Sequence, residues 1–378
     1  MANAIDYIKW RGDLTFRQSP VNEVDLFLFS QLSTLDYHKF LQPEEEMTLA
    51  EAAKHWFAIY RDDFKTLGLL QSRFLLNAFK EMAASARFKD IRIAMPRKTV
   101  NEGENEQFEA VTILPTKDLA VVSYRGTDDT LVGWKEDCYL AIMDKVVAQQ
   151  DAVDYLTQAA ARYPERRLVT VGHSKGGNLS IYAAVHVPKD IQERIVWSMG
   201  FDSPGFSRGF FEQPEYKAVE DRICTVLSQN STVGLLMNTA GRYLLVHSTV
   251  SGPFAHDGFN WSVERTRFIY EKELSTASLT FLGAMSDTLD NLDQRGRKRF
   301  VDALFDILGS SGARTITEFV EKGAGNSVKA VFQMAEDPAV RTFISAMVKG
   351  ATRSVLNIRA IRMEVDHTLV LMPPDEDL

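Results

Sequence analysis

The sequence has few cysteines and no long hydrophobic run. Only Cys138 and Cys224 occur among its 378 residues, each with apolar neighbours and neither in a Cys-x-x-Cys pair, which argues against a disulfide framework. No run approaches the roughly 18 uncharged apolar residues of a membrane-spanning helix, and charged residues interrupt the N-terminus where a signal peptide would need an apolar core. We therefore expect a reduced, cytoplasmic protein with no transmembrane segment.

Basic surface and cofactor motifs are scarce as well. The 43 Lys and Arg are outnumbered by 51 Asp and Glu, for a net charge of −8, and the single basic run, residues 295–299, is typical of a solvated helix start. This composition argues against nucleic-acid binding. The sequence has no phosphate-binding loop, no Gly-x-Gly-x-x-Gly after a strand and no His-Glu-x-x-His, so we expect neither cofactor nor metal. With 45% hydrophobic and 25% charged residues, the composition is that of a folded, enzyme-sized protein.

The hydrophobic periodicity predicts an α/β fold. Residues 47–87 show the three- and four-residue spacing of two amphipathic helices, and residues 90–126 alternate as strands of a meander do. A helix over 131–163, broken near Asp144, is followed by a strand at 167–172 and a helix at 176–187. Two more strand-like runs cover 194–201 and 222–227. Strands that alternate with helices in this way indicate a mainly parallel central sheet.

Beyond about Glu271 the pattern becomes helical. The clearest case begins at Asp337-Pro338, an N-cap followed by proline at the first helical position, and carries an apolar stripe to Val355. We therefore divide the chain into an α/β domain with an N-terminal helical segment (1–270), a C-terminal helical region (271–370) and an acidic tail (371–378).

A Gly-x-Ser-x-Gly motif, Gly172-His173-Ser174-Lys175-Gly176, lies between a predicted strand and a predicted helix. The motif alone is weak, but this context is the strand, sharp turn and helix of a nucleophile elbow. Glycines beside the serine let neighbouring backbone approach closely, and the helix N-terminus offers N–H groups to an oxyanion. Ser174 is therefore the predicted nucleophile, although a helix-capping serine would fit the same position.

A serine nucleophile needs a histidine base from later in the chain. His186 lies within the helix that follows the elbow, His247 lies in a strand-like run, and His367 is near the C-terminus. His256 lies in a loop between a Gly-Pro turn and Asp257-Gly258. We predict that His256 is the base, with a surface-loop histidine as the alternative.

The acid that orients the histidine is harder to assign. The usual position, after the strand at 222–227, holds Asn230 and Ser231 and no carboxylate. Asp202, which ends the preceding strand, lies on the same edge of the sheet and is the candidate acid, although an Asx turn before Ser-Pro-Gly would also explain it. Alternatively, Asn230 or Ser231 could hold the histidine as a neutral acceptor.

At these residues the chain resembles the class 3 lipases, and more specifically a bacterial branch of lipase-like α/β-hydrolases. One matching block is Tyr124-Arg125-Gly126-Thr127 with Trp134 and Asp137 downstream, and the other is the Gly172–Gly177 segment. The resemblance covers about Asp118 to Trp261. It implies an α/β-hydrolase fold.

The resemblance also implies further site residues. Thr127 stands where the family has an oxyanion-hole donor, which the backbone N–H of Lys175 would join. Arg125 and Asp137 look like a structural charge pair beneath that loop. The chain departs from the family at Lys175, where leucine is usual, and at Ser231-Thr-Val-Gly234, where an Asp-x-Val-Pro acid loop is usual.

Together these residues predict a serine hydrolase that cleaves carboxylic esters through an acyl-enzyme, with lipid or acyl esters favoured by the resemblance. The alternative is an α/β-hydrolase-like scaffold that binds a ligand or a protein without turnover, because the acid loop is missing. The sequence leaves the acyl length, a lid and the oligomeric state open.

Overall fold

The structure is a computed structural model. It describes residues 1–63, 67, 72–101, 103, 106–128, 130–140, 145–231, 233–235, 237–239, 241–276, 278–279 and 298. The predicted helix at 337–355, the acidic tail, His367, the basic run except Lys298, and nearly all of the C-terminal helical region lie outside these residues.

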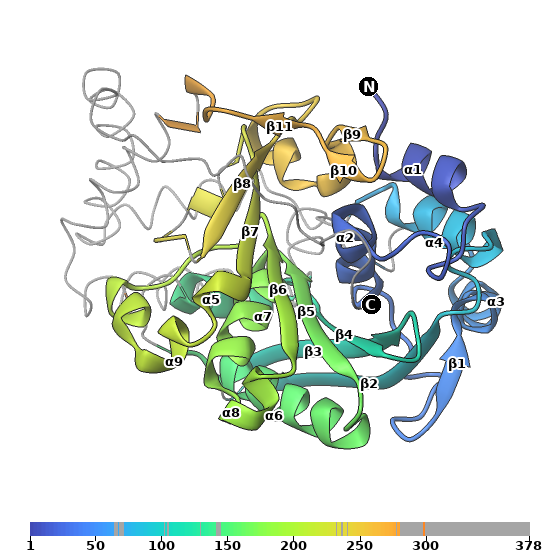
Figure 1. Cartoon of the computed structure of the whole chain (residues 1–378), viewed down its shortest axis with the longest axis horizontal. Helices are drawn as coiled ribbons and strands as arrows, with labels where there is room; N and C mark the ends of the chain where they lie inside the picture. Colours follow the sequence, from blue (N-terminus) through green and yellow to red (C-terminus); the bar gives the residue numbers. More distant parts are fainter. Residues whose placement is uncertain are drawn as a thin grey trace, which may run out of the picture.

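A mixed β-sheet forms the centre of the described chain (Figure 1), in the strand order β1-β2-β3-β4-β5-β6-β7-β8-β11. Strands β4 to β8 run parallel, and β1 to β4 and the β8–β11 pair are antiparallel. The α/β prediction with a mainly parallel central sheet is therefore confirmed, including the meander that leads into it. The strands are β1 (Glu46–Thr48), β2 (Arg92–Asn101), β3 (Glu106–Leu114), β4 (Leu119–Tyr124), β5 (Arg167–His173), β6 (Ile195–Phe201), β7 (Ile223–Ser228), β8 (Arg242–Val246) and β11 (Tyr270–Glu271), with a separate hairpin of β9 (Val263–Glu264) and β10 (Arg267–Phe268).

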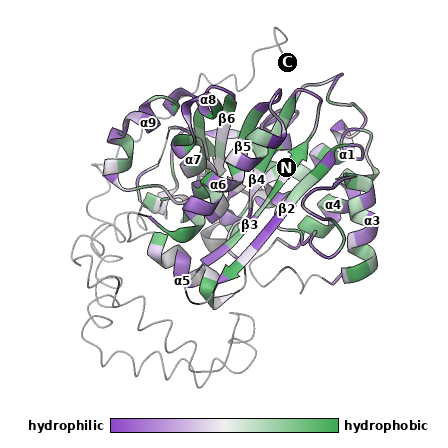
Figure 2. Ribbon diagram, turned by 90° about the horizontal axis from the view of Figure 1, so that it is seen from below, coloured by the Kyte–Doolittle hydropathy of each residue, from purple (hydrophilic) through white to green (hydrophobic). Residues whose placement is uncertain are grey.

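Helices cover both faces of the sheet. Figure 2 shows α6 to α9 on one side of the strands and α1, α3 and α4 on the other. On the first side, α6 and α7 pack on β3 to β6, and on the second α2 packs on β4 to β6. The helices are α1 (Ala4–Arg11), α2 (Glu23–Leu32), α3 (Leu49–Tyr60), α4 (Leu75–Ala84), α5 (Leu131–Leu140), α6 (Val147–Arg162), α7 (Lys175–His186), α8 (Lys189–Gln192) and α9 (Pro214–Lys217). None of the helices in the described part of the chain could cross a membrane.

The predicted break near Asp144 separates α5 from α6, and α3 and α4 are the two helices expected over 47–87. The sequence pattern predicts no particular helix or strand before Met47, where α1 and α2 lie. Every residue of α2 is buried, so its apolar residues show no amphipathic stripe. The helix is instead recognisable by its capping box, in which Asn22 and Asp25 each accept from the other's backbone N–H.

Phe27 of α2 connects the sheet to the segment around residue 260. The centroid of its ring lies 5.5 Å from the ring centroid of Phe201 at the end of β6, 5.3 Å from that of Phe259 and 5.7 Å from that of Trp261. A Cβ on Gly258 would lie 2.3 Å from the Phe27 ring, so only glycine fits there. The segment that follows His256 is thus packed directly on α2.

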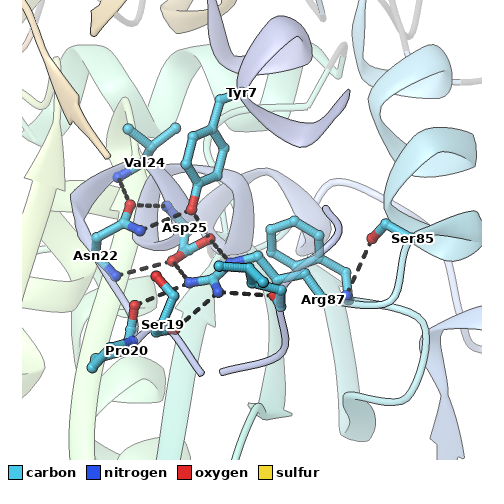
Figure 3. Close-up of polar contacts among 10 residues, drawn as sticks. Tyr7, Ser19, Pro20, Asn22, Val24, Asp25, Ser85 and Arg87 are labelled. Carbon is cyan, nitrogen blue, oxygen red and sulfur yellow. Dashed lines mark hydrogen bonds and ion pairs between the residues drawn. The ribbon is translucent and has the colours of Figure 1, made fainter. Parts of the chain in front are cut away.

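A buried ion pair attaches the N-terminal helices to the end of α4 (Figure 3). The Arg87 guanidinium donates to Asp25 through Nε at 2.9 Å and through Nη2 at 2.5 Å, and both side chains are fully buried. Asp25 also accepts from Tyr7 Oη at 2.8 Å, and burial raises the pKa of Tyr7. The remaining Arg87 donors bind the main-chain oxygens of Leu14, Ser19 and Pro20. One guanidinium therefore fixes the segment between α1 and α2.

Replacing Arg87 by methionine is expected to lower the free energy of unfolding by about 3–5 kcal/mol, because the Asp25 carboxylate is left buried without its counter-ion. Urea unfolding followed by tryptophan fluorescence measures the change. Lys80→Met is the matched control, since Lys80 pairs with Asp62 in an exposed ion pair, which contributes little. Equal losses in the two variants would contradict this account of the Arg87 cluster.

Candidate active site

Ser174 occupies the turn between β5 and α7. Its backbone has φ 58° and ψ −131°, a left-handed conformation that is strained for a residue with a side chain. The Ser174 N–H donates to Phe201 O at 2.9 Å, which continues the β5–β6 ladder to the turn. The strand, turn and helix expected around the motif are therefore present, with α7 beginning at Lys175.

Close backbone contacts explain two glycines near Ser174. A Cβ on Gly176 would lie 2.1 Å from Tyr124 O at the end of β4, and one on Gly126 would lie 2.8 Å from His173 O and 3.3 Å from Ser174 Cβ. Neither position leaves room for a side chain. The absence of these side chains brings the loop after β4, which contains Thr127, against the serine.

The structure brings His256 and Asp202 together. Nδ1 of His256 lies 2.7 Å from Oδ2 of Asp202. The Asp202 side chain is fully buried, and that of His256 is 23% exposed. Asp202 follows β6 with φ 44°, a second left-handed residue at the edge of the sheet that carries Ser174. With Nδ1 bound to the carboxylate, the ring is held in one orientation and its Nε2 remains for a proton.

His173 holds the backbone of His256. Its Nε2 lies 2.7 Å from His256 O, and the two ring centroids are 4.5 Å apart. Desolvation, reinforced by repulsion from His256, lowers the pKa of His173 to about 3. The ring is therefore neutral at ordinary pH, and it must donate its Nε2 hydrogen to the carbonyl. Since His173 precedes Ser174, this bond attaches the His256 loop to the serine turn.

The other candidates have different partners. His186 Nδ1 donates to Tyr182 O, one turn earlier in α7, and His247 Nδ1 lies 2.7 Å from Glu271 Oε1. The Asn230 side chain donates to Val250 O, and the Ser231 hydroxyl accepts from Gly234 N. Among the described residues, neither side chain is hydrogen-bonded to His256. Of the candidates for the acid, Asp202 is thus the one that contacts His256.

The two expected oxyanion donors come from adjacent segments. Thr127 is buried in the loop after β4, and Lys175 is the first residue of α7, where a helix leaves its N–H groups unpaired by its own carbonyls. The side chain of Lys175 is only 1% exposed and binds Glu136 of α5. The sequence predicts a role for the backbone of Lys175 only and does not indicate this buried cation.

Arg125 pairs with Glu109 of β3, and Lys98 of β2 lies 2.5 Å from the other oxygen of Glu109. Glu109 was not among the predicted site residues, because it is a buried carboxylate of β3 whose partners lie on other segments. The side chain of Asp137, the expected partner of Arg125, lies outside the described residues. That pairing stays a prediction.

A cavity of about 260 Å³ lies along the face of α7 that carries Asn178, Tyr182 and His186. Its opposite wall includes Phe206, Phe210 and other residues that follow Asp202. The amide of Asn178 donates to Gly205 O at 2.8 Å. Asn178, about one helical turn after Ser174, lines the cavity, whereas Ser174, His256 and Asp202 do not. No group of three metal-ligating side chains occurs among the residues that could be searched.

Comparison with known proteins adds a family match. A family model described as Mbeg1-like matches residues 82–306, more than half of the chain. No curated protein matches. Among solved structures, M37 lipase is 16% identical with a TM-score of 0.38, over 58% of this chain and 71% of its own. A Rhizomucor miehei lipase propeptide complex is 13% identical with a TM-score of 0.36, over 59% and 67%. A Penicillium expansum triacylglycerol lipase is 11% identical with a TM-score of 0.30, over 45% and 73%.

Gly176→Ala is expected to lower the free energy of unfolding by about 1–3 kcal/mol, because the added methyl group meets the backbone of β4, which cannot move away cheaply. Gly209→Ala is the matched control, since a Cβ there meets nothing within 4 Å. Thermal and urea unfolding of both variants measures the difference. A stable Gly176→Ala protein would show that β4 and the serine turn are further apart than described.

Proposed function

The chain belongs to the Mbeg1-like family, a lipase-like family, and from the contacts of its candidate site we propose that it is a serine hydrolase that cleaves carboxylic esters. The observation that carries the proposal is the 2.7 Å contact between His256 Nδ1 and buried Asp202, in a loop that His173 ties to the strained turn at Ser174. These are the parts of a nucleophile, base and acid.

In the first half of the proposed reaction, Ser174 Oγ attacks the ester carbonyl carbon and His256 Nε2 takes the hydroxyl proton. The carbonyl π electrons move onto oxygen, and the N–H groups of Thr127 and Lys175 stabilise the resulting oxyanion. Asp202 stabilises the imidazolium that forms. The oxyanion then collapses, the bond to the alcohol breaks, and the imidazolium returns the proton to the leaving oxygen.

In the second half, water attacks the acyl-serine ester while His256 accepts its proton. The same donors hold the second oxyanion; as this intermediate collapses, the bond between the acyl carbon and Ser174 Oγ breaks, the imidazolium returns the proton to Oγ, and the acid is released. Ser174, His256 and the oxyanion donors therefore each act twice per turnover. No cofactor or metal takes part in this proposal.

Lipid or acyl esters are the proposed substrates, as the resemblance to class 3 lipases and their bacterial branch implies. The cavity beside α7 has aromatic walls, with the Phe206 and Phe210 rings stacked at 3.9 Å, and lacks Asp, Glu, Lys and Arg among its lining residues. This lining suits an uncharged chain. Hydrolysis rates for p-nitrophenyl esters of increasing acyl length measure the preference.

A fluorophosphonate probe is expected to label the wild-type protein at Ser174 and to leave Ser174→Ala unlabelled. The same replacement should abolish hydrolysis of p-nitrophenyl esters above the rate of the buffer. Ser19→Ala is the control, because Ser19 lies between α1 and α2 and does not line the cavity, so its loss should change neither the labelling nor the hydrolysis rate.

A folded wild-type protein that the probe does not label would contradict the hydrolase proposal. That result would favour the alternative, a scaffold of lipase-like fold that binds without turnover. Labelling that persists in Ser174→Ala would instead place the nucleophile elsewhere in the chain.

Asp202→Asn is expected to lower kcat by roughly 10³- to 10⁴-fold, because an amide no longer stabilises the imidazolium. The neighbouring carboxylate, Asp257, provides the control. It accepts from Ser72 Oγ at 2.7 Å and from Phe259 N at 3.0 Å, and burial raises its pKa. Asp257→Asn should keep most of the wild-type kcat, and the reverse order of the two variants would assign the acid to Asp257.

We also propose a reducing, cytoplasmic location. The described structure supports it through Cys224, an unpaired thiol buried in β7, whose pKa burial raises. Such a thiol is unreactive and needs no oxidising compartment. Fractionation of the source cells measures the location directly.

A further inference from the structure

Lys175 differs from an ordinary residue at its position because its charge is buried. It follows Ser174 directly, yet its side chain is 1% exposed. The ammonium Nζ donates to Gln107 O at 2.7 Å, to Gln107 Oε1 at 2.7 Å and to Glu136 Oε2 at 2.8 Å. All three N–H donors of the ammonium are therefore used, on one residue of β3 and one of α5.

Glu136 extends the same network. Its Oε2 also accepts from Gln107 N at 3.1 Å, and its Oε1 accepts from Ala148 N at 3.2 Å, at the start of α6. Both carboxylate oxygens are thus bound, and the Glu136 charge neutralises that of Lys175 inside the protein. The first turn of α7 is connected by these bonds to β3, α5 and α6.

The network also reaches the loop that holds Thr127. A Cβ on Gly133 would lie 3.2 Å from Thr127 Cγ2 and 3.3 Å from Gln107 Oε1. The side chains of Thr127 and Gln107 therefore both approach Gly133 of α5. Gln107 thus binds Lys175 directly and shares a neighbour with Thr127, and the N–H groups of Lys175 and Thr127 are the proposed oxyanion donors.

Stability does not explain why a charge is kept here. Removing two ions from water is costly, and an apolar pair of similar volume is often as stable as a buried ion pair. An apolar side chain would fill the space, but it would form no directional bonds to β3 and α5. What the ammonium adds is a fixed geometry between segments.

We infer that the side chain of Lys175, with Gln107 and Glu136, is a positioning group that holds the two oxyanion donors at a fixed separation. This inference rests on the proposed function. Small displacements of such donors weaken stabilisation of the oxyanion far more than they weaken binding of the ester. The network should therefore affect kcat and leave KM nearly unchanged.

The test uses the full-length double variant Lys175→Met/Glu136→Gln, which removes both charges together. Relative to wild type, we expect kcat for a p-nitrophenyl ester to fall about 10- to 100-fold, with little change in KM. Gln107→Met is a milder second variant that keeps the ion pair. It should lower kcat about fivefold, as expected for the loss of one hydrogen bond.

The affinity for a trifluoromethyl ketone inhibitor separates a positioning role from a merely structural one, because a structural role would leave this affinity unchanged. Ser174 Oγ adds to the ketone carbon, its proton passes to His256, and the carbonyl oxygen becomes a stable oxyanion. The affinity for this inhibitor should fall in both variants by the same factor as kcat/KM. Binding of the analogue in which CH2 replaces the ketone carbonyl, which forms no oxyanion, should be unchanged.

The matched control is Arg87→Met/Asp25→Asn, which neutralises the fully buried ion pair drawn in Figure 3, on the opposite face of the sheet. It should leave kcat and inhibitor affinity at wild-type values below its unfolding temperature. The inference is overturned if either Lys175→Met/Glu136→Gln or Gln107→Met, shown to be folded by circular dichroism, retains wild-type kcat and inhibitor affinity. A wild-type protein without any turnover or labelling would overturn the proposed function, and with it this inference.

Discussion

The backbone turn at Ser174 is the constraint on which the site depends. A residue with a side chain is strained at φ 58°, at a cost of about 1–3 kcal/mol, so the neighbouring segments must hold it. The end of β4 packs closely against Gly176, and Gly126 in the loop after β4 packs against the backbone of His173. Phe201 O of β6 accepts a hydrogen bond from the Ser174 N–H. The order of the parallel strands is what places these segments on either side of the turn.

The two residues that flank Ser174 secure different parts of the site. His173 extends toward the loop of His256 and binds its carbonyl, while Lys175 extends toward β3 and α5. A sharp turn makes this divergence possible, because consecutive side chains point in different directions at the end of a strand. The positions that vary in a Gly-x-Ser-x-Gly motif are therefore the ones that join this elbow to its surroundings.

The sequence predicted those strands and helices whose apolar residues recur at a regular spacing. The strands β2 to β7 and the break between α5 and α6 follow from alternation and spacing, whereas α2, buried on all sides, shows no polar face. The loop histidine and the carboxylate at the end of β6 could be chosen by position, but their 2.7 Å contact could not, since two separate loops create it. Glu109, Gln107 and Glu136 were missed because a buried polar network depends on residues that are distant in sequence. The catalytic roles of Ser174, His256 and Asp202 remain predictions.

The position of α2 has a consequence for how this protein can be divided. The family match begins at residue 82, inside α4, and so leaves out the helix that covers one face of the central strands. A clone trimmed to the matched segment would expose Phe201, Phe259 and Trp261, which pack on Phe27, and would invite aggregation. The segment that matches the family is thus smaller than the unit that must be expressed, and homologues should be compared over the preceding eighty or so residues as well.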